Sequence, residues 1–218
     1  MVTAFEEELA KVLPPDLPRR EEIIAKAARH LELIVDANQQ FNLTRITTPR
    51  EAAIKHVLDS LLPLHLFADA RHILDAGSGA GFPGVPLALA LPETRFTLAE
   101  SIQKRARFLD SAVDAIRLHN VDVAAERAED VLRRRRIDLI TARAVAPITR
   151  ALELFGPALK AGARALLYKG PDVETEIANA EPAAGKLKVQ VRVIARYELP
   201  DRLGTRTIVE LNRTSWPC

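Results

Sequence analysis

Residues 75–84 read DAGSGAGFPG and bring four of the nine glycines of the chain into ten positions. Short apolar runs precede and follow this segment, and they predict a strand before it and a helix after it. A glycine-rich turn between a first strand and a first helix lets the backbone approach a ligand closely. The segment therefore predicts a ligand-binding turn.

The order of residues in this turn separates two classes of cofactor. The string G-x-G-x-x-G is present in residues 79–84, but a pyrophosphate fingerprint would begin at Gly77 and place its third glycine at Phe82. Asp75 precedes the glycines, and a carboxylate there would attract an ammonium group, directly or through water, and repel a phosphate. We therefore expect S-adenosylmethionine, with Asp75, Gly77 and Gly79 near it, rather than a nicotinamide or flavin nucleotide.

Two further acids stand where later strands are expected to end. Glu100 ends the second strand, where an acidic side chain accepts hydrogen bonds from ribose hydroxyls. Glu129 follows the third strand and can accept from an adenine amino group, while a neighbouring backbone N–H meets a ring nitrogen. Taken alone, Glu129 is equally compatible with a surface acid. Because ligands of open α/β sheets bind at the carboxyl ends of strands, we expect Asp75, Glu100 and Glu129 around one adenosyl site.

These residues are positioned by short apolar runs that alternate with segments of helix length. Strands are expected at residues 72–76, 95–100, 121–125, 137–142, 163–168, 189–197 and 205–211. Helical segments follow the first four strands, which predicts a parallel sheet with helices on both faces. Residues 198–204 are typical of the turn of an antiparallel pair. The predicted fold is α/β, with a Rossmann-like seven-stranded sheet.

The chain before this sheet is predicted to be helical. Apolar residues recur on one side of residues 20–41, and Thr48, Pro49 and Glu51 fit the N-cap, first and third positions of another helix. We therefore divide the chain into a helical N-terminal segment, residues 1–70, and a methyltransferase-type α/β domain, residues 71–218. Near the end of the chain, residues 182–185 (PAAG) are expected to form a mobile loop.

Composition limits the class of protein. A hydrophobic share of 48% and a charged share of 28% are those of a soluble globular protein. No apolar run approaches the ~20 residues that span a bilayer, and the acidic N-terminus is no signal peptide. The single cysteine, Cys218, excludes an internal disulfide framework and a cysteine-based metal site. A cytoplasmic monomer without a membrane partner or a bound metal is expected.

Missing residues narrow the methyl acceptor. Methylation of cytosine C5 needs a cysteine nucleophile, and Cys218 lies at the terminus. Methylation of exocyclic amines generally uses an Asn/Asp-Pro-Pro-aromatic motif after the fourth strand, where this chain reads TARAV at residues 141–145. A ring nitrogen with an available lone pair, such as guanine N7, needs alignment with the methyl group but no base. We therefore assign no catalytic base, and His56 receives no catalytic role.

Six motifs in a fixed order identify a family. They are Asn42-Leu43-Thr44, His56 to Ser60, Asp75 to Gly84, Lys104 to Leu109, Thr141-Arg143-Ala144 and Lys169-Gly170. In this combination the chain resembles the RsmG family, formerly glucose-inhibited division protein B, over roughly residues 20–212. The resemblance implies a class I S-adenosylmethionine-dependent methyltransferase fold. It also implies 16S ribosomal RNA, or the small ribosomal subunit, as partner and N7 of the guanine at position 527 as acceptor.

The resemblance also carries the family's cofactor contacts to five positions of this chain. They are Gly77, Phe82, Ala128, Glu129 and Arg143. Two features depart from the familiar pattern. Ala142 stands between Thr141 and Arg143, where the familiar form has a serine directly before the arginine, and residues 212–218 have no counterpart.

Two other functions stay open, and two basic clusters bear on the choice. The alternatives are a nucleotide-dependent oxidoreductase and a non-catalytic module that binds adenosylmethionine or the ribosome. The second stays open because N7 methylation needs no catalytic base whose presence in the sequence would prove activity.

Lys104, Arg105 and Arg107 follow the second strand, so they are expected to flank the opening of the cofactor site. The four arginines at residues 133–136 precede the fourth strand, which predicts a solvated face at the far edge of the sheet.

Overall fold

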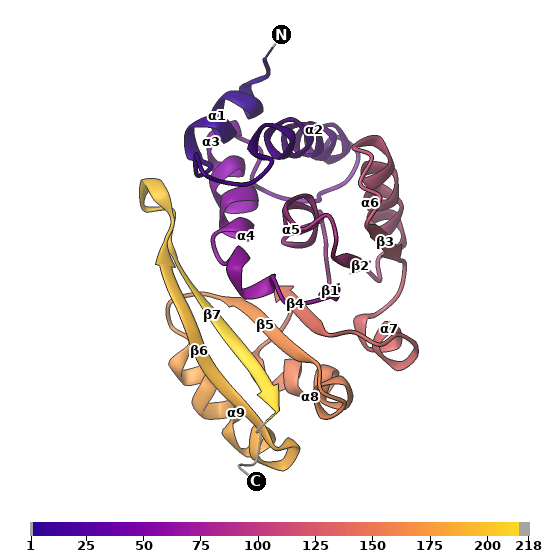
Figure 1. Cartoon of the computed structure of the whole chain (residues 1–218), viewed down its shortest axis with the longest axis vertical. Coiled ribbons are helices and arrows are strands. Elements are labelled where there is room, and N and C mark those ends of the chain that lie inside the picture. The colour runs from indigo at the N-terminus through magenta and orange to yellow at the C-terminus, as the bar shows by residue number, and fades with distance from the viewer. Residues whose placement is uncertain (1, 214–218) are drawn as a thin grey trace.

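Apolar residues alternate between the two faces of the central strands, so each strand is buried on both sides. In the computed structural model, which describes residues 2–213, Ile73 of β1 (His72–Ala76) lies in one apolar core and Leu74 in the other. Figure 1 shows the strands between two groups of helices. The layered α/β architecture that the sequence predicts is confirmed.

All seven predicted strands are present, each within two residues of its expected bounds. The remaining strands are β2 (Arg95–Ala99), β3 (Val121–Ala124), β4 (Leu139–Arg143), β5 (Arg164–Lys169), β6 (Val189–Glu198) and β7 (Thr205–Arg213). Their order is β3-β2-β1-β4-β5-β7-β6, with β1 to β5 parallel and β7 antiparallel to both its neighbours. Because the strand order reverses between β1 and β4, the ligand crevice is expected at their carboxyl ends.

The helices divide between the two faces of the sheet (Figure 1). One layer contains α1 (Ala4–Val12), α2 (Arg20–Asn38), α5 (Gly84–Ala90), α6 (Gln103–Ala115) and the helix of residues 49–61. The other layer contains α7 (Ala128–Arg134), α8 (Ile148–Lys160) and α9 (Glu174–Leu187). Two short 3₁₀ turns, η2 (Leu64–Phe67) and η3 (Pro200–Arg202), complete the elements of the described residues. The first helical layer therefore covers the side of the sheet next to the glycine turn.

The helix of residues 49–61 changes its winding part-way along. It begins as α3 (Pro49–Ala52), continues as the π-helical η1 (Ala53–Leu58) and ends as α4 (Asp59–Leu61). Thr48 is its N-cap and Pro49 its first residue, as the sequence predicts, although the Thr48 side chain makes no capping hydrogen bond. Single π-helical turns inside α-helices occur frequently at functional sites.

The N-terminal helices share an apolar core with the sheet. Leu9 of α1 and Ile23 of α2 belong to the same buried cluster as Ile73 of β1 and Phe96 of β2. The boundary predicted after residue 70 stays a prediction, but the packing continues across it. The helical segment therefore contributes to the stability of the sheet layer that supports the ligand edge.

One predicted loop is wrong. Residues 182–185 lie inside α9, because Ala180 and Ala184 are buried in the second core and the helix continues through Pro182 between them. The predicted turn at residues 198–204 is confirmed and contains η3. Cys218 lies outside the described residues. Within residues 2–213, no helix has the length and apolar character needed to cross a membrane.

A buried histidine of α2 should make stability depend on pH. His30 is 1% exposed, its Nε2 has no partner, and burial lowers its pKa to about 4. Because the unfolded chain takes up this proton near its ordinary pKa of 6.5, stability present above pH 6.5 is lost as the pH falls toward 4. Between about pH 7.5 and about pH 5, this histidine alone should cost roughly 2 kcal/mol.

We therefore expect the variant His30→Leu to lose roughly 2 kcal/mol less than the unaltered protein over that pH interval. Urea unfolding at both pH values measures the two differences, and other titrating groups cancel in the comparison. Equal pH dependence in the two proteins would contradict a neutral, buried His30.

Candidate cofactor and acceptor site

The glycines of the turn meet two different constraints. Gly77, Gly79 and Gly81 have φ angles of +69°, +58° and +99°, a region that side chains with a Cβ rarely adopt. Gly84 has no such angle, but a Cβ there would lie 2.3 Å from a methyl carbon of Leu98. The turn therefore requires glycine for its backbone path and for its close approach to β2.

Two buried acids hold this turn in place. Asp75, fully buried in β1, accepts a hydrogen bond from the Gly84 N–H at 3.0 Å. Glu100 accepts from the Gly79 N–H at 3.1 Å and from the Ile102 N–H at 2.8 Å. Burial raises the pKa of Asp75 to about 6, and its Oδ1 has no partner. Both carboxylates bind backbone of the turn, and their predicted contact with the cofactor stays a prediction.

A cavity of about 240 Å³ opens beside the turn at the carboxyl ends of β1 to β3. Its lining includes Gly77 from the turn, and Ala128 and Glu129 from the start of α7. Apolar side chains of α8 close the opposite side, Phe155 among them. Bare backbone, a carboxylate and an apolar wall fit an adenosyl group, so the residues present suit the predicted cofactor.

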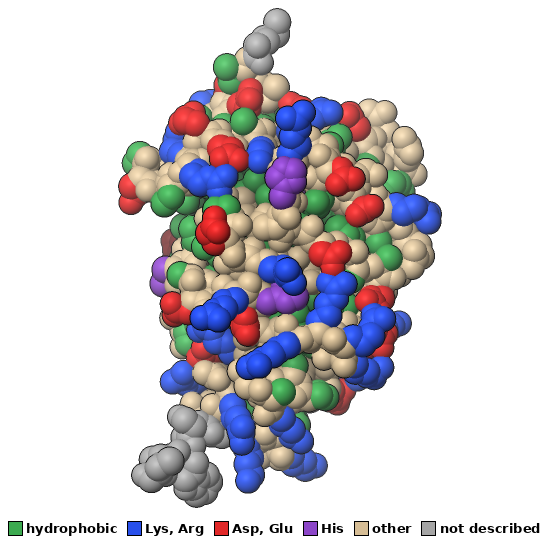
Figure 2. All heavy atoms as spheres, turned by 45° about the vertical axis from the view of Figure 1, so that its right-hand side comes forward, with side chains coloured by type: hydrophobic (Ala, Val, Ile, Leu, Met, Phe, Trp, Pro, Cys, Tyr) green, Lys and Arg blue, Asp and Glu red, His purple; other side chains and the backbone are tan. Residues whose placement is uncertain are grey.

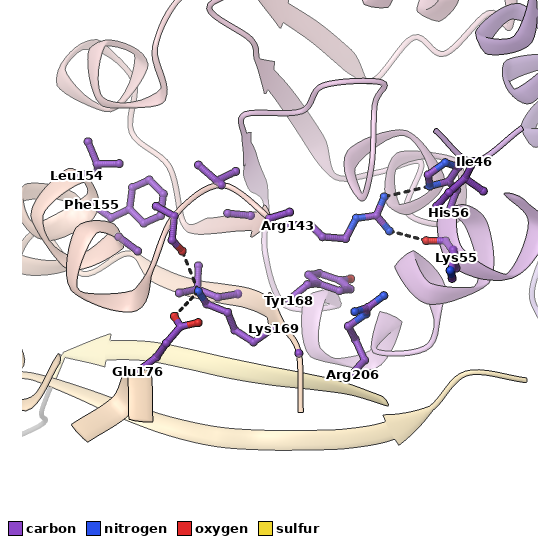
Figure 3. Close-up of a pocket in the computed structure, with 17 residues that line it drawn as sticks. Ile46, Lys55, His56, Arg143, Leu154, Phe155, Tyr168, Lys169, Glu176 and Arg206 are labelled. Carbon is purple, nitrogen blue, oxygen red and sulfur yellow. Dashed lines mark hydrogen bonds and ion pairs between the residues drawn. The ribbon is translucent and has the colours of Figure 1, made fainter. Parts of the chain in front are cut away.

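A second cavity, of about 430 Å³, adjoins the first at the carboxyl ends of β4 and β5. Figure 3 shows Arg143 and Arg206 approaching it from two strands, with Lys169 and Glu176 farther along. Both cavities are lined by Val145 and Ala146, which follow β4. Val145 also packs on the turn, since a Cβ at Gly77 would lie 2.9 Å from its Cγ2. Two compartments meeting at one loop suit a donor and an acceptor.

The second cavity carries a concentration of positive charge. Its lining includes Lys55, Arg143, Lys169 and Arg206 as cations and Glu176 as the acid. The Lys169 Nζ lies 2.6 Å from a Glu176 carboxylate oxygen and donates to the Ala146 carbonyl at 2.8 Å. Glu176 in turn accepts from the Ile148 N–H at 3.1 Å. This chain of contacts connects β5 and α9 to the loop between the two cavities.

One buried carboxylate organises the arginines of this cavity. Asp59, fully buried in α4, accepts from the Arg143 Nη1 at 3.2 Å and from the Arg206 Nε at 3.1 Å. The Tyr197 hydroxyl donates to the same carboxylate at 3.2 Å. Arg143 also donates to the Lys55 carbonyl at 2.8 Å. Asp59 thus connects the N-terminal helix, β4 and the β6–β7 pair.

An aromatic stack connects the glycine turn to this ion cluster. Phe82 is buried, with its ring 4.4 Å from the His56 ring at an interplanar angle of 8°. The Arg143 guanidinium lies 5.5 Å from the Phe82 ring. Burial, followed by the charge of Arg143, lowers the pKa of His56 to about 3, so the imidazole is neutral at physiological pH. The Thr44 hydroxyl oxygen lies 3.1 Å from the His56 Nε2.

The predicted site residues fall into two groups. Gly77, Ala128 and Glu129 line the first cavity, and Arg143 lines the second. Asp75, Gly79, Phe82 and Glu100 support the turn beside them. Sequence reasoning missed Asp59 as the partner of Arg143, and it missed Arg206 and Glu176. Of these three residues, only Asp59 could have been found from the sequence. It lies three positions from His56, so the two side chains are expected on one face of a helix.

The two basic clusters differ in location and in pairing. Lys104, Arg105 and Arg107 lie on α6, which begins at the ligand edge, and within residues 2–213 they form no ion pair. The arginines at residues 133–136 line a hollow with Gly162 and Ala163, before β4 and β5 begin. Three of them pair with acids, Arg133 with Asp130, Arg134 with Glu126 and Arg135 with Asp122. The predicted far-edge location of the arginine run is confirmed.

The wider surface also mixes charges. Figure 2 shows one face, on which Lys and Arg side chains gather in the lower half at the height of α7 to α9, with Asp and Glu side chains among them. A basic stretch of sequence therefore does not by itself mark a surface free to bind a polyanion, since neighbouring acids neutralise part of it.

Comparison with known proteins identifies the family. A family model described as rRNA small subunit methyltransferase G matches residues 23–203. The chain belongs to this family. The protein of that name from Solibacter usitatus is 64% identical over 207 residues, covering 95% of this chain and 99% of the relative. The one from Carboxydothermus hydrogenoformans is 37% identical, covering 83% of this chain and 79% of the relative.

Solved structures agree on the fold. An O-methyltransferase from Bacillus cereus has a TM-score of 0.60 at 20% identity, covering 97% of this chain and 98% of that one. An O-methyltransferase from Streptomyces achromogenes has a TM-score of 0.57 at 21% identity, covering 98% of this chain and 97% of that one. The predicted family, class I methyltransferase fold, enzyme class and methyl donor, S-adenosylmethionine, are confirmed.

The buried Asp59 should be essential for stability. Removing one partner of a buried ion cluster leaves uncompensated charges, which typically costs roughly 3–5 kcal/mol. We expect Asp59→Ala to lose stability of this order because Arg143 and Arg206 both lose their carboxylate. Urea unfolding measures the loss. The control Asp114→Ala removes an exposed carboxylate of α6 and should change stability little; similar effects in both variants would refute the bridging role.

Proposed function

We propose that this protein transfers the methyl group of S-adenosylmethionine to N7 of the guanine at position 527 of 16S ribosomal RNA. The observation that carries the proposal is the pair of adjoining cavities, one suited to an adenosyl group and one lined by four cations. The family to which the chain belongs supports the RNA substrate. The site of methylation rests on the resemblance and on the chemistry of the second cavity.

The residues of the first cavity would hold the cofactor. Gly77 would allow close backbone approach, and the Glu129 carboxylate, which lines the same cavity as Ala128, would accept a hydrogen bond from the adenine amino group. Asp75 and Glu100 keep the turn in the conformation that this approach requires. When bound, the cofactor would supply an electrophilic methyl group on a sulfonium, and Val145 and Ala146 would lie between it and the second cavity.

The second cavity suits an acceptor that needs no proton removed. His56 is buried beside Arg143 and stays neutral, and the Asp59 carboxylate is committed to two arginines. Guanine N7 already presents its lone pair in the plane of the ring, so positioning is the main requirement. Each of the four cations there already has an acidic partner, so the donors for the guanine O6 would be the guanidinium N–H groups that Asp59 does not engage.

Two measurements test this function against its alternatives. Calorimetry with S-adenosylmethionine and with NAD separates a methyltransferase from an oxidoreductase. Transfer of a tritiated methyl group to 30S subunits and to naked 16S RNA then separates an enzyme from a non-catalytic binding module. Chain cleavage specific for N7-methylguanine locates the modified base. Failure of transfer to both substrates, with adenosylmethionine bound, would favour the non-catalytic module.

The proposal extends to the cellular setting. We propose that the protein works in the cytoplasm, where ribosomal subunits are assembled, and that it acts as a monomer. Sedimentation of the pure protein measures its oligomeric state, and fractionation measures the share of the protein that travels with small ribosomal subunits.

Glu129 tests the position of the adenine. Glu129→Ala should weaken adenosylmethionine binding by roughly 1–2 kcal/mol, because the adenine amino group loses its acceptor. Calorimetry measures the affinity. The neighbouring Asp130→Ala is the control, since Asp130 pairs with Arg133 and does not line the cavity. Unchanged affinity in a folded Glu129→Ala protein would place the adenine elsewhere.

The two basic clusters test the orientation of the RNA. Lys104→Ala and Arg105→Ala should lower RNA affinity and reduce the log–log salt dependence by nearly one unit for each phosphate that is no longer bound. Adenosylmethionine affinity should change by no more than a small electrostatic effect. Arg133→Ala and Arg135→Ala should leave RNA affinity and methyl transfer nearly unchanged, because these arginines line the far-edge hollow and pair with Asp130 and Asp122, which line neither cavity. RNA binding measured against salt concentration decides, and the opposite pattern would reverse the orientation.

A further inference from the structure

A groove between α2 and α6 lies outside the two cavities already described. It encloses about 540 Å³ between the C-terminal end of α2 and the outer face of α6. Its lining combines three kinds of side chain, the aromatic Phe41 and Phe108, the basic Lys104 and Arg107, and the acceptor-bearing Asp36 and Gln40. Aromatic rings, cations and hydrogen-bond acceptors together match the chemistry of a nucleotide.

The aromatic rings of the groove are partly exposed and lie against each other edge to face. The Phe41 and Phe108 centroids are 6.5 Å apart at an interplanar angle of 78°. The Lys104 ammonium lies 5.1 Å from the Phe41 centroid. Phe41 is partly exposed and lines the groove, and the exposed Lys104 side chain covers one face of its ring. A nucleobase stacking there would take the place of the ammonium, which would then be free to bind a phosphate.

Ring contacts continue from the groove to the glycine turn. Phe108 lies 6.4 Å from His30, His30 lies 5.2 Å from Phe82, and Phe82 stacks on His56. The first turn of α6 follows Glu100 directly at the ligand edge of the sheet. Packed rings therefore connect the lining of the groove to the turn, and α6, which carries Lys104, Arg107 and Phe108, begins at the ligand edge.

The charge of the groove favours RNA over a protein partner. Within the described residues, Lys104 and Arg107 form no ion pair, so their charges are available to a polyanion. Asp36 is the acid that lines the same groove, and a carboxylate accepts hydrogen bonds from the amino groups of nucleobases. Unstacked bases of RNA are commonly held on aromatic side chains in this way.

We propose that this groove binds an unpaired nucleotide of the substrate RNA that flanks the methylated guanine. The base stacks on Phe41, its amino or imino hydrogens bind Asp36, and its phosphate binds Lys104 and Arg107. The proposal rests on the function proposed above, and it adds a base-stacking contact that lies outside both cavities.

Variants of Phe41 separate stacking from charge. Phe41→Leu keeps an apolar side chain but removes the ring, so RNA affinity should fall between about five-fold and about a hundred-fold. The slope of affinity against salt should not change, because stacking releases no counterions. Phe41→Trp should keep the affinity, and its indole fluorescence should be quenched by RNA, with the unaltered protein as spectral reference. The control Val193→Ala trims an exposed apolar side chain on the edge strand β6 and should bind normally.

The experiment uses the full chain, a 16S RNA fragment that contains the target guanine, and adenosylmethionine calorimetry as a check that each variant is folded. Weaker RNA binding by Phe41→Leu with unchanged salt slope and cofactor affinity supports the proposal. Binding equal to that of the unaltered protein overturns the stacking contact and leaves the methyltransferase function intact. A dimer that Phe41→Leu dissociates in sedimentation would assign the groove to a second copy and also overturn it. If the unaltered protein neither binds nor methylates the RNA, the proposed function itself fails.

Discussion

The second cavity of this protein depends on one carboxylate that is removed from water. Asp59 is fully buried and faces Arg143 from β4 and Arg206 from β7, with the Tyr197 hydroxyl beside them. Taking a carboxylate out of water is unfavourable unless opposite charge and hydrogen bonds replace the lost hydration. Strands β4, β6 and β7 therefore have to meet at Asp59, and this requirement fixes the positions of the two guanidinium groups. Since both arginines line the second cavity, the same carboxylate sets the shape and the charge of that cavity.

The first cavity is organised by a different constraint, the close approach of the turn's backbone to side chains of β1 and β2. Gly84 lies so near β2 that a side chain would collide with Leu98, and Asp75 accepts the Gly84 N–H from beneath. Glu100 binds the Gly79 N–H from the next strand. Asp75 and Glu100 thus accept hydrogen bonds from the protein's own backbone. Without the two carboxylates, these N–H groups would have to bind water. The buried carboxylates hold the turn in one arrangement, and this arrangement preorganises the cavity.

Sequence patterns predicted the strands because the signals are local. Alternation of apolar residues and the glycine turn need no distant partner, and β1 was predicted with its exact bounds. Residues predicted at strand ends, such as Gly77 and Glu129, do line a cavity, and their contact with the cofactor stays a prediction. Arg206 joins Asp59 across 147 positions through the pairing of β7 with β5, and no local pattern encodes that register. The predicted loop at Pro182 was wrong for the same reason, since packing of Ala180 and Ala184 outweighs a local helix breaker.

The basic clusters show how structure separates charges that look alike in sequence. An arginine that already faces a carboxylate must give up that partner before it binds a phosphate, so its contribution to RNA binding is reduced. Arg133, Arg134 and Arg135 are in this position, whereas the cations of α6 face solvent and an aromatic ring. The helix that carries these unpaired cations begins just after β2, at the edge of the sheet where the first cavity opens. The location of these cations and their lack of acidic partners both favour the surface of α6 as the one that binds RNA. The two observations are independent, because strand order determines the location of the cations and nearby acids determine their pairing.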